Sequence, residues 1–145
     1  MCSSDLAITA DDVAAAERLG NVTFLGHRND VEVLYGAFDC YVLASYREGF
    51  PRSAMEAAAC GLPIVATDIR GCRQVVDHER TGLLVAVRDS AALAAAVERI
   101  AADGALRAAM GTAAVLKARA EFDQQRVIDI TLDTYARLQI GRAHV

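Results

Sequence analysis

The stretch Cys40-Tyr-Val-Leu-Ala44, with Glu48-Gly-Phe-Pro-Arg-Ser-Ala-Met-Glu56 just after it, decides how this sequence folds. The first run is short and apolar, which predicts a buried β-strand. The second leads into an alanine-rich helix that is closed by Cys60-Gly-Leu-Pro63. Because open α/β folds bind ligands at the carboxyl ends of their strands, we expect a binding site in this strand–loop–helix unit. The carboxylates of Glu48 and Glu56 can accept hydrogen bonds from ligand hydroxyls, and backbone N–H groups at the start of a helix can bind phosphate.

Strand and helix patterns alternate from about Val22 to Ala102, which predicts an α/β fold with a doubly wound, parallel, Rossmann-like sheet. The expected strands are Val22–Leu25, Cys40–Ala44, Pro63–Thr67 and Gly82–Val85. The expected helices are Val13–Leu19, Val31–Phe38, Ser53–Cys60, a short one within Gly71–Val76, Ala91–Ala102, Ala105–Ala120 and Gln124–Leu138. We expect Asp11 and Asp12 to cap the first helix. The continuous apolar run of Cys40–Ala44 predicts a strand covered on both faces.

Composition narrows the class of protein. The 145 residues correspond to one domain or part of one, and the net charge of −4, without a Lys/Arg cluster, argues against a nucleic-acid partner. No apolar run approaches the ~20 residues that span a bilayer. His27 and His78 lack metal-ligand spacing. The cysteines show neither metal nor disulfide spacing: Cys2, Cys40, Cys60 and Cys72. Those within the fold are expected to be buried, reduced thiols of a cytoplasmic protein.

The two ends of the chain share an unusual relationship. Ile140–Val145 can be encoded by ATC GGA AGA GCA CAC GTC, and the opposite strand, read from its GTG, encodes Met1–Asp5. That oligonucleotide looks like a common sequencing adapter. We therefore expect Met1–Leu6 and Ile140–Val145 to be scars outside the fold, which leaves 7–139 as a partial domain.

Glu48 and Glu56 are expected to belong to different elements. Eight residues along one helix rotate by about 80°, so two glutamates on one helix would not face together. Gly49 and Pro51 favour a loop position for Glu48, and the pair can then converge on one ligand. Other interpretations stay open: a capping box of Ser53 with Glu56, a solvated loop carboxylate at Glu48, a surface charge at Arg52, and an ordinary turn serine at Ser45.

The segment from about Asn21 to Leu138 resembles glycosyltransferase family 4, the retaining transferases of GT-B fold. The pieces that carry the resemblance are Val22–Gly26, Phe38–Ser45, Arg47–Ala57, Cys60–Asp68, Gly71–Val76 and Thr81–Val85, in that order. The resemblance implies the C-terminal, donor-binding half of such an enzyme. It also implies transfer of a sugar from a nucleotide diphosphate sugar to an acceptor hydroxyl, with the anomeric configuration retained.

The resemblance implies roles for individual residues. The E-x7-E motif of the family falls on Glu48, which would contact the donor sugar and the developing charge as the catalytic residue, and on Glu56, which would bind the ribose. The sugar and diphosphate would be lined, largely by backbone, by Gly49, Phe50, Pro51 and Arg52, and Gly71 would add a backbone contact. The family implies no metal and no cofactor besides the donor, which we expect to be UDP-linked.

The same resemblance sets the expected partners and limits. Pro51-Arg52 is a variant associated with bacterial polysaccharide and lipid-linked glycan synthesis, so the acceptor would be a lipid-linked or growing glycan. The full enzyme would work in the cytoplasm. It would associate peripherally with the inner face of the membrane. Gln74 stands where the family often has Glu. The diphosphate-gripping Arg and Lys, the first strands and the acceptor domain of the family lie upstream of the matched segment. We therefore expect an incomplete sheet, weak donor binding and no transfer by this chain alone.

Three other classes remain as alternatives. A sugar-nucleotide epimerase of GT-B fold would carry a different carboxylate and histidine set. A non-catalytic nucleotide-sugar-binding domain would be favoured by loss of Glu48, which is present. A signalling domain would need an acidic pocket at the strand ends, and Asp39 and Asp68 do not form one in the sequence pattern.

Overall fold

The structure of this protein is a computed structural model that describes residues 8–140, without the side chains of 126, 127, 139 and 140. The expected scar at Met1–Leu6, and all of Ile140–Val145 except its first residue, lie outside the described residues. The chain divides into two compact units, Met1–Val31 and Glu32–Val145.

The first unit contains helix α1 (Ala10–Glu17), which begins earlier than expected. Thr9 is its N-cap: the Thr9 hydroxyl accepts from the Asp12 N–H, and the Asp12 carboxylate accepts from the Thr9 N–H. The expectation that Asp11 and Asp12 precede the helix is wrong, because both lie in its first turn. There their negative charges interact favourably with the positive end of the helix dipole.

The expected strand Val22–Leu25 is also wrong, because this segment has no regular secondary structure. A strand needs the N–H and C=O groups of a neighbour, and no other strand is described within residues 8–31. The apolar side chains of the segment are accordingly exposed, with Leu25 at 50%.

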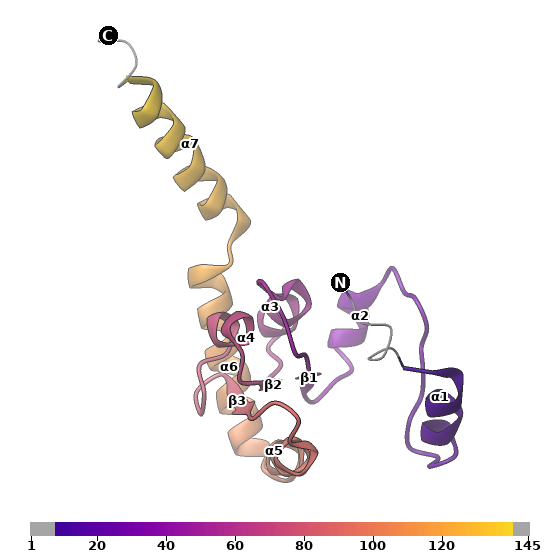
Figure 1. Cartoon of the computed structure of the whole chain (residues 1–145). Helices are drawn as coiled ribbons and strands as arrows, with labels where there is room; N and C mark the ends of the chain where they lie inside the picture. The colour runs from indigo at the N-terminus through magenta and orange to yellow at the C-terminus, as the bar shows by residue number, and fades with distance from the viewer. Residues whose placement is uncertain (1–7, 141–145) are drawn as a thin grey trace. The chain divides into compact units, whose positions relative to one another are not determined.

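The second unit is built around three parallel strands, β1 (Tyr41–Leu43), β2 (Ile64–Thr67) and β3 (Gly82–Val85), in the order β1-β2-β3 (Figure 1). The other three expected strands are confirmed, with β1 one residue shorter at each end and β2 beginning one residue later than expected, at Ile64. The helices along the chain are α2 (Val31–Tyr35), α3 (Arg52–Ala59), α4 (Arg70–Val75), α5 (Ser90–Ala102), α6 (Gly104–Glu121) and α7 (Gln124–Ile140).

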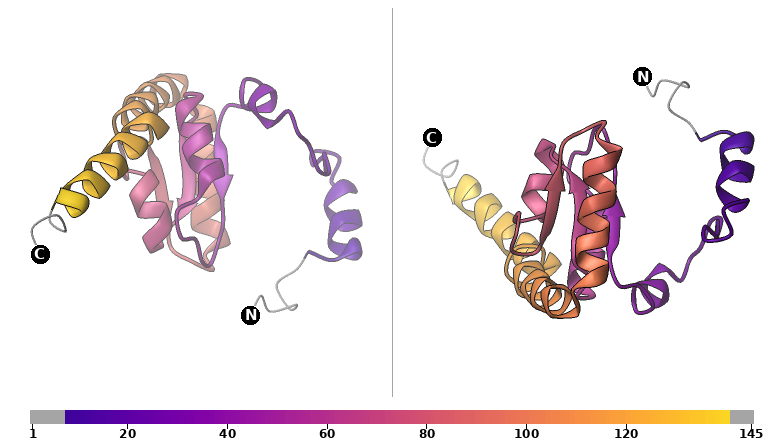
Figure 2. Two further views of the ribbon diagram at one scale, coloured as in Figure 1. Left: turned by 90° about the horizontal axis from the view of Figure 1, so that it is seen from above. Right: turned by 90° about the horizontal axis from the view of Figure 1, so that it is seen from below.

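Helices cover both faces of this sheet (Figure 2). Alternate residues of β2 point to opposite faces, so Ile64 and Ala66 pack with α3, α4 and α6, while Val65 packs with α5. Every residue of β2 is buried, as expected for a central parallel strand. Val42 of β1 is 42% exposed, so the expectation that this strand is covered on both faces is wrong. In the described residues β1 pairs with β2 alone and forms an edge of the sheet.

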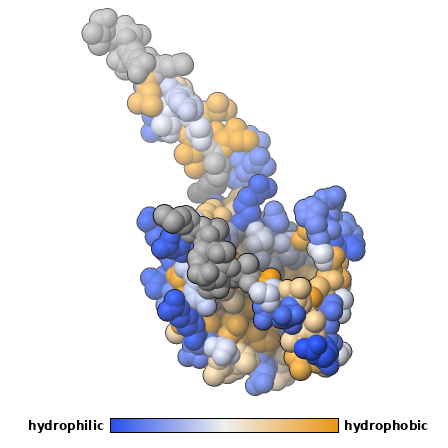
Figure 3. All heavy atoms as spheres, turned by 45° about the vertical axis from the view of Figure 1, so that its right-hand side comes forward, coloured by the Kyte–Doolittle hydropathy of each residue, from blue (hydrophilic) through white to orange (hydrophobic). Residues whose placement is uncertain are grey.

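Helix α7 differs from the other helices of this unit, because none of its described side chains is buried. Figure 3 shows apolar atoms along this helix on the molecular surface. Its large exposed apolar side chains are Ile128, Ile130, Leu132, Tyr135 and Leu138. Among residues 8–140 no helix has both the length and the apolar character needed to cross a membrane.

Candidate functional site

The loop after β1 carries Glu48 to the carboxyl edge of the sheet, as the sequence predicts. The carboxylate is half-buried, and its Oε1 accepts a hydrogen bond of 2.7 Å from the Ser45 hydroxyl. The Ser45 carbonyl oxygen in turn accepts a hydrogen bond of 2.5 Å from the Thr67 hydroxyl at the end of β2. Glu48 is therefore part of a hydrogen-bonded loop and not a freely solvated carboxylate.

Gly71, in the first turn of α4, lies against the same loop. A β-carbon at this position would come 2.4 Å from the Glu48 carbonyl oxygen and 2.9 Å from the Glu48 β-carbon. Such distances exclude any side chain without movement of the backbone. Gly71 therefore lies in direct contact with the Glu48 backbone, and its expected backbone contact with the donor stays a prediction.

Glu56 lies on α3, in the element expected for it. The helix begins at Arg52 after Pro51, which is buried, has an extended backbone and offers no side-chain cap. The alternative capping box is wrong, because Pro51 is the N-cap and Ser53 lies within the helix, where its hydroxyl accepts from the Tyr41 hydroxyl at 2.7 Å. Glu56 Oε2 lies 3.5 Å from the Tyr35 hydroxyl, and Glu56 Oε1 lies 4.0 Å from the largely exposed Arg52 guanidinium.

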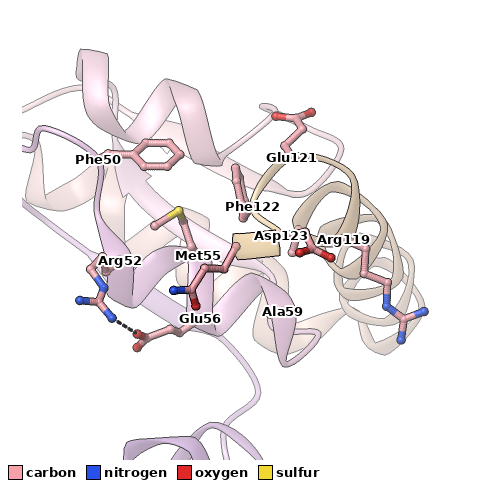
Figure 4. Close-up of a pocket in the computed structure, with 11 residues that line it drawn as sticks. Phe50, Arg52, Met55, Glu56, Ala59, Arg119, Glu121, Phe122 and Asp123 are labelled. Carbon is pink, nitrogen blue, oxygen red and sulfur yellow. Dashed lines mark ion pairs between the residues drawn. The ribbon is translucent and has the colours of Figure 1, made fainter. Parts of the chain in front are cut away.

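A cleft of about 700 Å³ lies beside the start of α3 and the junction of α6 with α7 (Figure 4). Phe50, Met55 and Phe122 form its apolar part, and the Phe50 and Phe122 rings meet edge-to-face with centroids 5.7 Å apart. Arg52 and Glu56 line it at the helix start. The other lining residues are Ala59, Ala118, Arg119, Glu121, Asp123 and Gln124.

Glu48 does not line this cleft. A second cavity, of about 310 Å³, lies at the strand ends between Tyr46, Thr67 and Arg88, and neither carboxylate lines it. The structure therefore brings Phe50, Arg52 and Glu56 together, and places Glu48 with Ser45 and Gly71. The expected single cavity shared by Glu48 and Glu56 is not formed by either of these two hollows.

The thiols are only partly as expected. Cys72 is buried, and burial raises the pKa of its thiol. Cys40 is half-buried, but Cys60 is exposed because it ends α3 at the surface, so the prediction of burial is wrong there. Among residues 8–140 no three His, Cys, Asp or Glu side chains are grouped so as to hold a metal ion.

A family model described as "Glycosyl transferases group 1" matches residues 10–117, which is most of the sequence. The chain belongs to this family. The expected α/β fold is confirmed, and it is that of part of a GT-B glycosyltransferase.

Individual group 1 transferases agree with this assignment. The chain is 43% identical over 97 residues to a D-inositol 3-phosphate glycosyltransferase of an Arthrobacter species, covering 67% of this chain and 23% of that protein. It is 33% identical over 119 residues to the N,N'-diacetylbacillosaminyl-diphospho-undecaprenol alpha-1,3-N-acetylgalactosaminyltransferase of Campylobacter jejuni. This match covers 82% of this chain and 31% of the Campylobacter protein. The structure of Anabaena Alr3699/HepE in complex with UDP is similar at a TM-score of 0.82 and 27% identity, covering 88% of this chain and 35% of that one. The chain thus spans about a quarter to a third of these proteins.

The sequence alone did not indicate two residues that line or contact the candidate site, Tyr35 and Phe122. Tyr35 reaches Glu56 across 21 positions of the chain, and its only signal was helical spacing in α2. Phe122 ends α6 far from the motif in sequence and completes the cleft beside Phe50. Tertiary contacts of this range leave no local pattern.

Proposed function

We propose that this chain is the donor-binding part of a retaining glycosyltransferase of family 4. The enzyme transfers a sugar from a UDP-linked donor to an acceptor hydroxyl in bacterial polysaccharide or lipid-linked glycan synthesis. It acts in the cytoplasm, with the full-length enzyme associated peripherally with the inner face of the membrane. The donor is its substrate, and no metal or other cofactor takes part.

The observation that carries this proposal is the position of Glu48 and the start of α3 directly after β1, in a chain of the group 1 family. Ligands of open α/β folds bind at this edge. The similar Anabaena protein was solved in complex with UDP, which supports a uridine nucleotide as ligand.

Each site residue has a role in the proposal that suits its chemistry. Glu48 accepts hydrogen bonds from donor-sugar hydroxyls and stabilises the positive charge that develops on the sugar. Glu56 accepts from the ribose hydroxyls. The backbone of Gly49 and Phe50, and of Gly71, lies along the sugar and diphosphate.

The start of α3 assists departure of the nucleoside diphosphate. N–H groups in the first turn of a helix lack partners within that helix and favour negative charge. Arg52 adds a cation at the same point, and its only ion pair among the described residues is the long contact to Glu56. Together these groups stabilise the leaving diphosphate without a metal.

The acceptor is proposed from the relatives. The Campylobacter relative is named for a diphospho-undecaprenol substrate, and the Arthrobacter relative for inositol 3-phosphate. The first of these supports a lipid-linked glycan as acceptor for the present protein.

Nucleotide titration tests the proposal. We expect UDP to raise the melting temperature of the chain and GDP and ADP to do so less, since a ligand at ~100 times its Kd stabilises a fold by about 2.7 kcal/mol. Glu56→Gln should weaken UDP binding by roughly 10-fold, as expected when a charge-assisted hydrogen bond is lost.

Glu98→Gln is the matched control, because Glu98 is exposed on α5 and contacts no part of the candidate site. It should leave UDP binding unchanged. Absence of binding by all three nucleotides, or equal loss in both variants, would contradict the proposed donor site.

A further inference from the structure

The hydrogen bond between Ser45 and Glu48 orients the Glu48 side chain within its loop. The carboxylate has four acceptor positions, and the Ser45 hydroxyl takes up one of them on Oε1 at 2.7 Å. The hydrogen bond spans three residues of the same loop, so it fixes the side chain relative to its own backbone. Within residues 8–140 this is the one hydrogen bond described for the Glu48 carboxylate, so its remaining acceptor positions are open to a ligand.

Ser45 is itself held by the sheet. Its carbonyl oxygen accepts from the Thr67 hydroxyl at 2.5 Å, and Thr67 is only 5% exposed at the end of β2. Thr67 also pairs in register with Val85 of β3, so its backbone belongs to the sheet at the end of its central strand. Thr67 thus ties the loop that carries Glu48 to the most buried strand.

Gly71 also packs closely against the loop that carries Glu48. The Glu48 carbonyl carbon would lie 2.7 Å from a β-carbon at position 71, so the two backbones are closer than any side chain permits. Gly71 is buried, and its backbone does not have positive φ. The absence of a side chain here therefore serves close packing against Glu48 and not an unusual backbone conformation.

We propose that Ser45 and Thr67 are positioning residues that hold the Glu48 carboxylate ready for the donor sugar, and that Gly71, besides its own backbone contact with the donor, packs against the same loop and keeps it in place. This inference rests on the proposed function, in which Glu48 contacts that sugar. Ordering a long side chain on binding costs affinity, and a carboxylate that is already ordered avoids a penalty of about 2- to 10-fold. Ser45 and Thr67 act through Glu48 and do not touch the ligand.

The first test needs no ligand. NMR three-bond couplings of Glu48 report whether its χ1 angle occupies one rotamer or several. We expect a single rotamer in the wild-type chain and averaged couplings in Ser45→Ala, with a smaller change in the isosteric Thr67→Val. Averaging already present in the wild type, or couplings unchanged in Ser45→Ala, would overturn the proposal.

Ser53→Ala is the matched control for that experiment. It also removes a single serine hydrogen bond of 2.7 Å, in this case with the Tyr41 hydroxyl, at a position outside the Glu48 loop. It should leave the Glu48 couplings unchanged. A change as large as that in Ser45→Ala would show that general loosening of the fold is responsible, and would count against the proposal.

The second test uses ligands and separates this inference from the proposed function. The ratio of the Kd for UDP to the Kd for UDP-glucose measures the contribution of the sugar. We expect Ser45→Ala to reduce that ratio by about 5-fold and leave the Kd for UDP unchanged. In a Glu48→Ala background the Ser45→Ala change should have no further effect.

Gly71→Ala should reduce the same ratio, whereas Gly104→Ala should not, because a β-carbon at Gly104 meets its nearest atom at 3.9 Å. An additive effect of Ser45→Ala in the Glu48→Ala background would overturn the proposal even if UDP-glucose binds. Failure of the wild-type chain to bind UDP would count against the proposed function, and the NMR couplings would still decide the positioning of Glu48.

Discussion

The Tyr35 side chain joins α2 to the helix that carries Glu56. Its hydroxyl donates to the Ser53 carbonyl oxygen at 3.2 Å and lies 3.5 Å from Glu56 Oε2. The residue is 4% exposed. Burial, reinforced by the nearby Tyr41 and Glu56, raises the pKa of Tyr35 to about 12. The neutral hydroxyl is therefore the form that the fold requires.

This pKa predicts how stability depends on alkaline pH. An unfolded tyrosine ionises near pH 10, so the Tyr35 contribution is fully present below pH 10 and is lost as the pH rises towards about 12. We expect the stability advantage of the wild type over Tyr35→Phe to fall by up to about 2 kcal/mol as the pH rises through this range, because the unfolded tyrosine ionises first. Urea unfolding from pH 9 to pH 12 measures it, and a difference that stays constant would contradict the burial of this hydroxyl.

Sequence reasoning succeeded for site residues whose position follows from local rules. Glycine and proline between the two glutamates place Glu48 in a loop and Glu56 on a helix, as the structure has them. It did not identify the partner of Ser53, whose spacing to Glu56 also fits a capping box, the alternative left open. The Tyr41 hydroxyl binds Ser53 instead, and a partner from a strand 12 residues away cannot be read from a local motif.

The sequence predicted well those strands and helices that pack against other elements of the sheet unit. β1, β2 and β3 and the helices after them lie within a few residues of the expected bounds, because their apolar periodicity matches real burial. Val22–Leu25 has the composition of a strand but forms none. Composition predicts the tendency to form a strand, but the hydrogen bonds of a neighbour are needed to realise it.

The close contact between α6 and the end of α3 leads to a prediction about the stability of a Gly111 variant. A β-carbon at Gly111 of α6 would lie 2.2 Å from the carbonyl oxygen of Gly61, just after α3. Alanine normally stabilises a helix relative to glycine by up to about 1 kcal/mol, but here the collision should dominate. We expect Gly111→Ala to destabilise the fold by about 1–3 kcal/mol, the usual cost of overpacking.

Gly104→Ala in the same helix is the control for this prediction, because an added β-carbon there meets nothing closer than 3.9 Å. It should be neutral or slightly stabilising. Thermal or urea unfolding of both variants measures the difference. Equal stability of the two would show that α3 and α6 are not packed as closely as described.

At the scale of the molecule, the site combines an edge of the sheet with a cleft formed by distant helices. The edge, with Glu48 and Gly71, follows from the α/β pattern and was predicted from the sequence. The cleft was not predicted from the sequence, because Phe122, at the end of α6, is distant in sequence from Phe50, which it contacts. The two parts are held together by α3, which starts beside the Glu48 loop and carries Glu56 into the cleft.

The central claim is that Glu48 and Glu56 contact one nucleotide sugar, although they line no common cavity among the two described. A crystal structure of the chain with UDP-glucose tests this most directly. We expect ribose hydroxyls at about 2.6–3.2 Å from the Glu56 carboxylate and a glucose hydroxyl at a similar distance from the Glu48 carboxylate. A nucleotide sugar bound with either carboxylate out of reach would contradict it.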